Sequence, residues 1–241
     1  MTDTLVSYRL DGRVATLTMD DGKANAVSPT MLASLNRALD QAEADKAVVV
    51  LAGREGRFSA GFDLTVLWSG GPAAADMLTG GFELAARMLA FPRPIVAACT
   101  GHALAMGAFL LLACDHRIGA DGTYKIGANE VAIGLTMPYA AIELCRQRIG
   151  PSYFTRTVID AEIYTPAGAV AAGFLDQVVP ATEVMSAAQA TAAALAKLNM
   201  TAHAATKLRV RESTLRALRA GIEADAAGFA DWARAAPRPA G

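Results

Sequence analysis

This sequence has almost no excess of charge of either sign and few cysteines, and each of these two features excludes a class of protein. The net charge is −1, from 22 basic and 23 acidic residues, so we expect no field strong enough to gather nucleic acid or bind an anionic membrane. The three cysteines are far apart among apolar neighbours. That pattern is typical of small buried hydrophobes rather than of a disulfide framework or a metal site.

Long hydrophobic runs are also missing. The longest uncharged apolar stretch, 103–114, contains Gly107 and is well short of the roughly 20 residues that a membrane-spanning helix needs. The first residues lack the basic and apolar regions of a secretory signal. We therefore expect no transmembrane helix and a cytoplasmic location.

Several catalytic fingerprints are absent too. The chain has no G-x-G-x-x-G after a strand, no G-x-x-x-x-G-K-[ST] and no G-x-S-x-G, which argues against dinucleotide binding, a P-loop and a serine-hydrolase elbow. The three histidines are His102, His116 and His203. No recognisable nucleophile accompanies them, so we expect no catalytic role for any of the three. His102 should pack in its loop, His116 should start a strand and His203 should lie on a helix face.

What the chain does have is apolar residues in regular patterns. With 241 residues, 53% of them hydrophobic, it can form one globular domain, or one plus an appendage. Alternating residues around Asp11-Gly12 predict a β-hairpin over 5–19, and Ser28-Pro29 predicts the start of a helix that runs to about Ala44. Further strands are expected at 47–52, 94–100, around Ile118, at 124–126 and at 175–179, and helices at 107–114, 138–149, 166–173 and from 182 onward.

The two ends of this pattern differ in character. Strand, loop and helix repeat through the first part of the chain, whereas the last part is rich in alanine and helical. We therefore divide the chain into a core over 1–185 and an all-helical appendage over 186–241, whose proline-rich end, 237–241, should fray.

Two glycine-bearing loops, 57–64 and 101–107, each join a predicted buried strand to a predicted helix. A helix N-terminus leaves its first N–H groups unpaired and partially positive, which suits an oxyanion. Two donors from separate loops can therefore clamp one carbonyl oxygen. The alternative is that both loops are ordinary turns in which glycine supplies conformational freedom.

Four short motifs follow one another along the chain. They are Phe58-Ser-Ala-Gly-Phe-Asp-Leu64, then Gly101-His-Ala-Leu-Ala-Met-Gly-Ala108 running into Ala113-Cys-Asp115, then Ile126-Gly-Ala-Asn-Glu-Val131, and Ile133-Gly-Leu135. In order and spacing they resemble the crotonase (enoyl-CoA hydratase/isomerase) superfamily. The resemblance extends from the first hairpin, through 167–180, into the C-terminal helices, and so covers nearly the whole chain.

The resemblance implies an α/β fold, a crotonase-like right-handed spiral of ββα units followed by a helical trimerisation region. Trimers, or hexamers made of two trimers, are then expected. The implied partner is an acyl-CoA thioester, and no separate cofactor is expected because CoA is part of the substrate. The chain ends soon after Trp232 without the family's usual ending, so the CoA contacts made there have no counterpart that we can predict.

The resemblance also implies site residues. The thioester carbonyl would lie between the backbone N–H groups of Phe62 and Met106, and the segment 23–26 would receive the adenine of CoA. Asp63 and Asp115 are expected to tie loops by hydrogen bonds. The implied substrate-binding residues are Lys23, Ala24, Ala26, Ala60, Phe62, Leu64, Met106 and Phe109.

The acids depart from the pattern of the family's hydratases. One hydratase glutamate would lie where this chain has Phe109, whereas the other corresponds to Glu130, and a further acid position, at 137–139, is empty. Adding water across a double bond uses two carboxylates that bracket the water, whereas moving a double bond needs a single base. The stretch around Glu130 is similar to that of mitochondrial 3,2-trans-enoyl-CoA isomerases, which also keep one glutamate, and 176–180 and the short loop at 24–26 fit that subgroup.

We therefore predict an isomerase with Phe62, Met106 and Glu130 as its catalytic groups. Two alternatives stay open: a hydratase that uses Glu130 alone, and a paralogue that binds acyl-CoA without catalysis. The depth of the acyl pocket would depend on how the segment 65–87 folds over the acyl tail.

Overall fold

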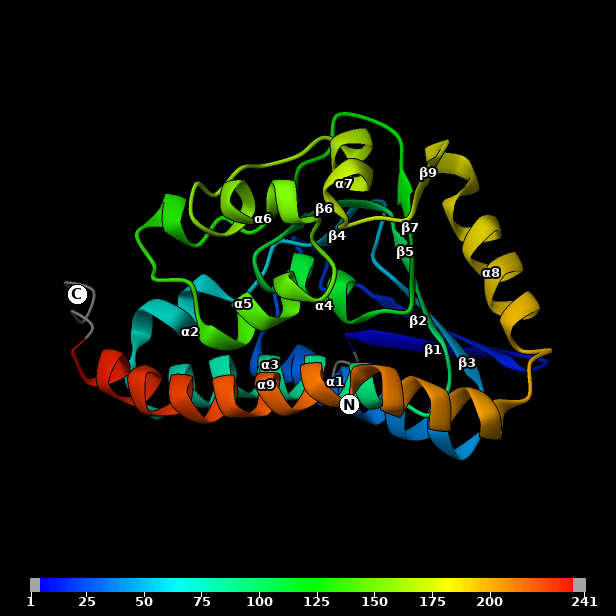
Figure 1. Ribbon diagram of the computed structural model, residues 1–241, viewed down its shortest axis with the longest axis horizontal. Helices are drawn as coiled ribbons and strands as arrows, with labels where there is room; N and C mark the ends of the chain where they lie inside the picture. Colours follow the sequence, from blue (N-terminus) through cyan, green and yellow to red (C-terminus); the bar gives the residue numbers. More distant parts are fainter. Residues whose placement is uncertain (1–4, 236–241) are drawn as a thin grey trace.

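The computed structural model describes residues 5–235 and consists of two β-sheets enclosed by helices (Figure 1). The predicted fraying of 237–241 lies outside the described residues. The chain starts with β1 (Val6–Asp11), β2 (Val14–Met19), α1 (Pro29–Ala44), β3 (Val48–Ala52), β4 (Gly56–Ser59), α2 (Leu64–Ser69) and α3 (Gly71–Ala90). It continues with β5 (Ile95–Cys99), β6 (Gly101–Leu104), α4 (Met106–Ala113), β7 (His116–Ala120), β8 (Ile126–Gly127) and the short 3₁₀ helix η1 (Val131–Ile133). The remaining elements are α5 (Tyr139–Arg146), α6 (Pro151–Val158), α7 (Pro166–Ala172), β9 (Gln177–Val179), η2 (Ala181–Glu183), α8 (Val184–Leu195) and α9 (Met200–Ala235).

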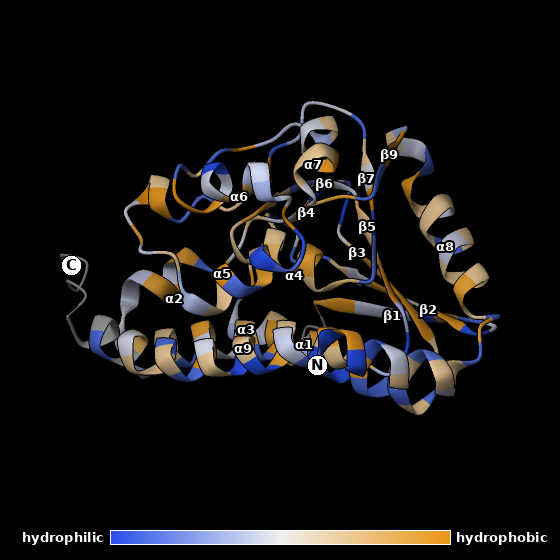
Figure 2. Cartoon of the chain, viewed as in Figure 1, coloured by the Kyte–Doolittle hydropathy of each residue, from blue (hydrophilic) through white to orange (hydrophobic). Residues whose placement is uncertain are grey.

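The larger sheet has the strand order β1-β2-β3-β5-β7-β9. Only the predicted hairpin, β1 with β2, is antiparallel, and every later pair is parallel. Strands β3 and β5 are buried on both faces, which is why their sequences are continuously apolar rather than alternating. Figure 2 shows this apolar interior as orange strands, whereas α9 alternates between the two colours.

The smaller sheet, β4-β6-β8, is parallel throughout. Each of its strands follows a strand of the larger sheet in the chain and is followed in turn by helix: β3 leads to β4 and α2, β5 to β6 and α4, and β7 to β8 and η1. The chain thus repeats a ββα unit, as the resemblance implies. The carboxyl ends of β4 and β6 meet at the same edge, so the two glycine loops leave the sheet together.

Several predicted boundaries differ from the structure. The strand predicted at 124–126 corresponds to β8, which begins only at Ile126 and pairs with β6 in the smaller sheet. Helix α5 ends at Arg146 rather than at residue 149, and β9 covers only Gln177–Val179. In each case the end of the element depends on its partner strand or on the neighbouring turn. The local sequence does not specify either of them.

The C-terminal part is helical, as predicted, but its helices belong to the core. Val184, Ala188 and Ala192 of α8 pack on one face of the large sheet, and Leu218 and Ile222 of α9 enter the main core. Figure 1 shows α9 running along α3 and α5. The expected division at residue 185 falls inside α8, and a role of this region in trimerisation stays a prediction.

The three cysteines, Cys99, Cys114 and Cys145, are free and buried, which confirms their interpretation as small apolar residues. No helix within the described part of the chain is both long and apolar enough to cross a membrane.

Candidate active site

The two glycine loops touch one another. Gly61 lies between β4 and α2 with φ +96°, and a Cβ built on it would stand 2.7 Å from the Cβ of Ala105 and 3.3 Å from the backbone nitrogen of Met106. Only glycine tolerates both this φ and this approach. The glycine therefore brings the residues after it, Phe62 and Asp63, against the start of α4.

The N–H of Phe62 is directed away from its backbone neighbours. Phe62 forms a parallel bridge with Val27, in which the Val27 N–H donates to Gly61 at 2.8 Å and the Asp63 N–H donates to Val27 at 3.4 Å. In such a bridge the residue between the two bonded positions directs its own N–H to the opposite side. Within residues 5–235, the Phe62 N–H has no hydrogen-bond partner.

Met106 supplies a second unpaired donor. It is the first residue of α4, and the preceding Ala105 has φ +49° and ψ −126° with no side-chain cap. The carbonyl of Ala105 accepts from Ala108 and Phe109, whereas the Met106 N–H has no partner among the described residues. Two free donors on touching loops are the arrangement needed to hold one oxyanion.

Glu130 lies between β8 and η1, in the segment that follows the strand bordering this loop. The Ala105 N–H donates to the carbonyl of Gly127 at 3.0 Å, so the segment leading to Glu130 adjoins the Met106 loop. The carboxyl group is buried, with the residue 7% exposed, and its Oε2 has no hydrogen-bond partner in the described structure. Burial raises the pKa of Glu130 from near 4.5 to about 7, which suits a general base at neutral pH.

Phe109 follows Met106 by one helical turn and is 1% exposed. Its ring centroid lies 6.1 Å from that of Phe82 on α3, and Phe82 lies 6.1 Å from Phe62. The position where hydratases of the resembled family carry an acid is therefore part of an aromatic wall.

The loop at 21–26 is organised by Asn25, which sequence reasoning did not single out. Asn25 is buried with φ +52°, and its Nδ2 donates to the carbonyls of Met19 and Phe58, while Ser59 Oγ donates to its carbonyl. A left-handed conformation favours asparagine among non-glycine residues, and this preference is the signal that could have identified it.

Asp21 completes this loop. Its carboxylate accepts N–H bonds from Lys23, Asn25 and Ala26. Partial burial works against ionisation, but these backbone bonds outweigh it and lower the pKa of Asp21. The Ala60 N–H donates to Ala24 at 3.0 Å, so the loop that the resemblance assigns to adenine is fastened to the Phe62 loop.

The other residues of the predicted set lie around these loops. Lys23 is exposed, and Leu64, 52% exposed, begins α2. Asp63 caps α2 by accepting from Thr65 at 2.8 Å, so the hydrogen bonds of its side chain stay within its own segment. Asp115 accepts from Ile95 at 2.7 Å and joins distant segments, as predicted.

His102 packs as predicted, although it lies in β6 rather than in a loop. His102 Nδ1 accepts from the Lys125 N–H, and its ring meets Tyr124 edge-on. His116 starts β7, and His203 lies on α9.

Both the sequence and the structure of this chain are similar to those of known proteins. The family model described as enoyl-CoA hydratase/isomerase matches residues 9–238. Human mitochondrial enoyl-CoA delta isomerase 1 is 31% identical over 224 residues, covering 91% of this chain and 74% of the relative. A putative enoyl-CoA hydratase of Thermus thermophilus is 34% identical, covering 86% and 82%. A crystal structure of an enoyl-CoA hydratase/isomerase family protein from Pseudomonas syringae is 52% identical with a TM-score of 0.93, covering 95% of this chain and 100% of that one.

Proposed function

This chain belongs to the enoyl-CoA hydratase/isomerase family, and from that premise we propose that it moves the double bond of a 3-enoyl-CoA to give the 2-enoyl-CoA. The observation that carries the proposal is the state of Glu130, a buried carboxyl with an unpartnered oxygen and a pKa of about 7, accompanied by phenylalanine at the position of a second acid. A single base of this kind suffices for a proton shift.

The proposed reaction begins when the thioester oxygen accepts hydrogen bonds from the N–H groups of Phe62 and Met106. Glu130 removes a proton from C2, and the electron pair of that C–H bond delocalises through C1 onto the oxygen to give a dienolate. The same glutamic acid then returns the proton to C4, and the double bond moves from between C3 and C4 to between C2 and C3. The two N–H donors stabilise the oxyanion in both directions. All atoms stay within substrate and Glu130, so no separate cofactor is required.

The apolar wall supports isomerisation over hydration. A water molecule that attacks C3 must be held and deprotonated, and Phe109 offers it no hydrogen bond. The same wall keeps water away from the dienolate and keeps the carboxyl of Glu130 desolvated. Hydration remains the second candidate function because relatives at comparable identity are named as hydratases.

Two substrates separate the candidates. The purified full chain is mixed with 3-hexenoyl-CoA or with 2-hexenoyl-CoA, and the absorbance of the conjugated thioester is followed. We expect absorbance to appear from the first substrate and to persist with the second. Loss of absorbance from the second substrate would indicate a hydratase, and no change from either, with measurable binding of the thioester, would indicate a binding protein.

Glu130→Gln tests the assigned base in the same assay. The amide keeps the size of the side chain but cannot accept a proton at neutral pH, so turnover should be abolished while thioester binding is kept. Glu143→Gln is the matched control, because Glu143 is a carboxylate on α5 that pairs with the exposed Arg146, and turnover should not depend on it. Unchanged turnover in Glu130→Gln would remove Glu130 from the mechanism.

The assembly is proposed from the resemblance. We propose a homotrimer or a hexamer in solution, measurable by light scattering, and a cytoplasmic location.

A further inference from the structure

Four phenylalanine rings gather beside the two oxyanion donors. Phe82 is at their centre, with its ring centroid 6.1 Å from Phe62, 6.1 Å from Phe109 and 6.3 Å from Phe229. The Phe62 ring meets it edge-on, whereas the Phe229 ring is stacked on it. Each of the four rings comes from a different segment: the loop before α2, α3, α4 and α9. We call these four residues the aromatic cluster.

Helix α3 closes directly on the residues that carry the donors. A Cβ built on Gly81 would stand 2.5 Å from the ring of Phe62 and 3.4 Å from the Sδ of Met106. Glycine is unfavourable inside a helix, and here it provides the space that the Phe62 ring occupies. The next residue, Phe82, places its ring centroid 6.1 Å from those of both Phe62 and Phe109.

The proposed reaction directs the acyl tail toward the aromatic cluster. In the proposed reaction the thioester oxygen is held by the N–H groups of Phe62 and Met106, and C2 and C3 lie beside Phe109, one turn further along α4. Carbons beyond C4 then meet the cluster. Phe82 and Phe109 are each 1% exposed, so a long tail could enter only by displacing a buried ring from its aromatic partners, at the cost of those contacts.

We propose that Phe82, backed by Phe229 of α9, is the end wall of the acyl subsite and limits the protein to short acyl-CoA thioesters. The inference rests on the proposed acyl-CoA function and adds the class of acyl group. It also makes α9 a determinant of specificity, because the ring that supports Phe82 from behind comes from that helix.

The test measures binding of butyryl-, hexanoyl-, octanoyl- and decanoyl-CoA by titration calorimetry. These saturated thioesters have no double bond to move or hydrate, so the result does not depend on which reaction the protein catalyses. For wild type we expect the affinity to be highest for the short thioesters and to fall for octanoyl- and decanoyl-CoA.

Two variants should move this limit. Phe229→Ala and Phe82→Leu open space at the wall, so octanoyl-CoA should bind more tightly than to wild type, by about fourfold for each additional methylene that becomes buried, which is about 0.8 kcal/mol per methylene. Phe229 is only partly buried, so its replacement keeps the test available if Phe82→Leu folds poorly. Phe174→Leu is the matched control, since Phe174 is fully buried and contacts Tyr164 in another part of the molecule; its chain-length profile should match wild type.

Two results would overturn the inference. One is a wild-type affinity that rises about fourfold per methylene through decanoyl-CoA, which would mean that the acyl subsite is open. The other is that the affinities of both variants depend on acyl chain length in the same way as those of wild type. Failure of all four thioesters to bind would instead refute the acyl-CoA function itself, and the inference with it. Short-chain binding without turnover of 3-hexenoyl-CoA would refute the isomerase proposal and leave the chain-length limit standing.

Discussion

Glu130 is a single side chain whose burial links activity to pH. It can act as a base only when ionised, and its pKa of about 7 lies within the working range. We expect kcat/KM for 3-hexenoyl-CoA to rise about tenfold per pH unit below pH 7 and to level off above it. A pH profile from 5 to 9 checks this, and a flat profile would show that another group provides the base.

The same burial has a cost in stability. The pKa of Glu130 is higher in the folded protein than its ordinary value near 4.5, so its contribution to stability is complete below pH 4.5 and is lost as the pH rises through about 7. The loss is roughly 3 kcal/mol for a shift of this size. The difference in free energy of unfolding between Glu130→Gln and wild type should therefore favour the variant more at pH 8 than at pH 4. Urea unfolding at the two pH values measures this, and equal differences at both would contradict it.

In the proposed function, Phe109 occupies the position that would separate an isomerase from a hydratase. Phe109→Glu places a second carboxyl near the proposed position of C3, where it can hold water together with Glu130, so hydration of 2-hexenoyl-CoA should rise above wild type and isomerisation should slow. The gain will be partial, because the position is 1% exposed and burying a second carboxylate costs several kcal/mol, about 3 to 5. Phe109→Leu, which removes the ring without adding an acid, is the control and should show no hydration. No gain in Phe109→Glu would mean that this position does not determine the reaction.

At the scale of elements, α5 depends on α9 for its N-terminal cap. Helix α5 begins after Pro138 with no cap from its own segment. Instead the carboxylate of Asp225, on α9, accepts from the N–H groups of Tyr139 and Ala140 at 2.9 and 2.8 Å. A Cβ on Gly221 would stand 2.9 Å from the Ala140 nitrogen, so the two helices are in direct contact at this point. The segment that leads from Glu130 to α5 is thereby anchored at its far end.

Removing this cap should affect both stability and catalysis. Asp225→Ala leaves two N–H groups and the positive end of α5 uncompensated, at a cost of about 1 to 2 kcal/mol, and the freed segment should lower kcat for 3-hexenoyl-CoA. Asp225→Asn can still accept one hydrogen bond and should recover part of the lost stability and part of the lost kcat. The control is Thr165→Ala, which removes the cap of α7 and should destabilise without changing kcat. Equal loss of kcat in the two alanine variants would show that Asp225 acts on stability alone.

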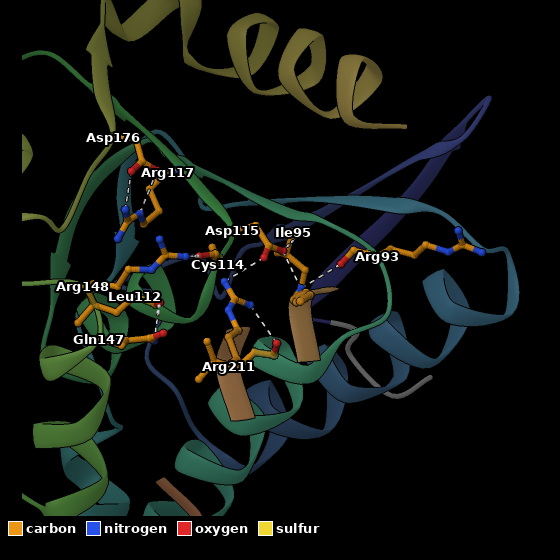
Figure 3. A network of polar contacts seen from close by, with 12 residues as sticks. Arg93, Ile95, Leu112, Cys114, Asp115, Arg117, Gln147, Arg148, Asp176 and Arg211 are labelled. Atoms are coloured by element: carbon orange, nitrogen blue, oxygen red, sulfur yellow. Dashed lines mark hydrogen bonds and ion pairs between the residues drawn. The ribbon is translucent and has the colours of Figure 1, made fainter. Parts of the chain in front are cut away.

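At the scale of the whole molecule, Asp115 connects strands to the last helix (Figure 3). Its carboxylate accepts from the Ile95 N–H and pairs with Lys207 at 2.7 Å and Arg211 at 3.0 Å. Both cations are on α9, and Lys207 is only 4% exposed. The start of β5, the end of α4 and α9 are therefore joined through one buried charge.

Asp115→Asn should be strongly destabilising for this reason. It leaves two mostly buried cations without their counter-charge, which costs about 3 to 5 kcal/mol. Glu143→Gln, which breaks the more exposed pair with Arg146, should cost about 0 to 1 kcal/mol. Denaturant midpoints of the two variants give the comparison. A loss below about 1 kcal/mol in Asp115→Asn would mean that α9 is held by apolar packing without help from this network.

Features encoded within a few residues were determined by the sequence alone. Ser28 and Pro29 predict the start of α1, and Ser28 Oγ indeed accepts from Met31. The apolar run of β3 predicts a strand buried on both faces, and it is one. The motifs place Phe62, Met106 and Glu130, and the structure adds that the two N–H groups are free and that the carboxyl is buried. These signals are local because caps, turns and periodicity depend on neighbouring residues.

Only the tertiary structure decided which distant segments meet. No local pattern indicates that β8 pairs with β6, that Asp225 caps α5, or that Phe229 stacks on Phe82. Each of these contacts joins elements that are separate in the chain, and each forms because close packing of the whole core leaves one arrangement that fills the space and satisfies the buried polar groups. Short motifs thus indicate the residues of the candidate site, whereas the shape of the proposed acyl subsite depends on helices that the fold brings together.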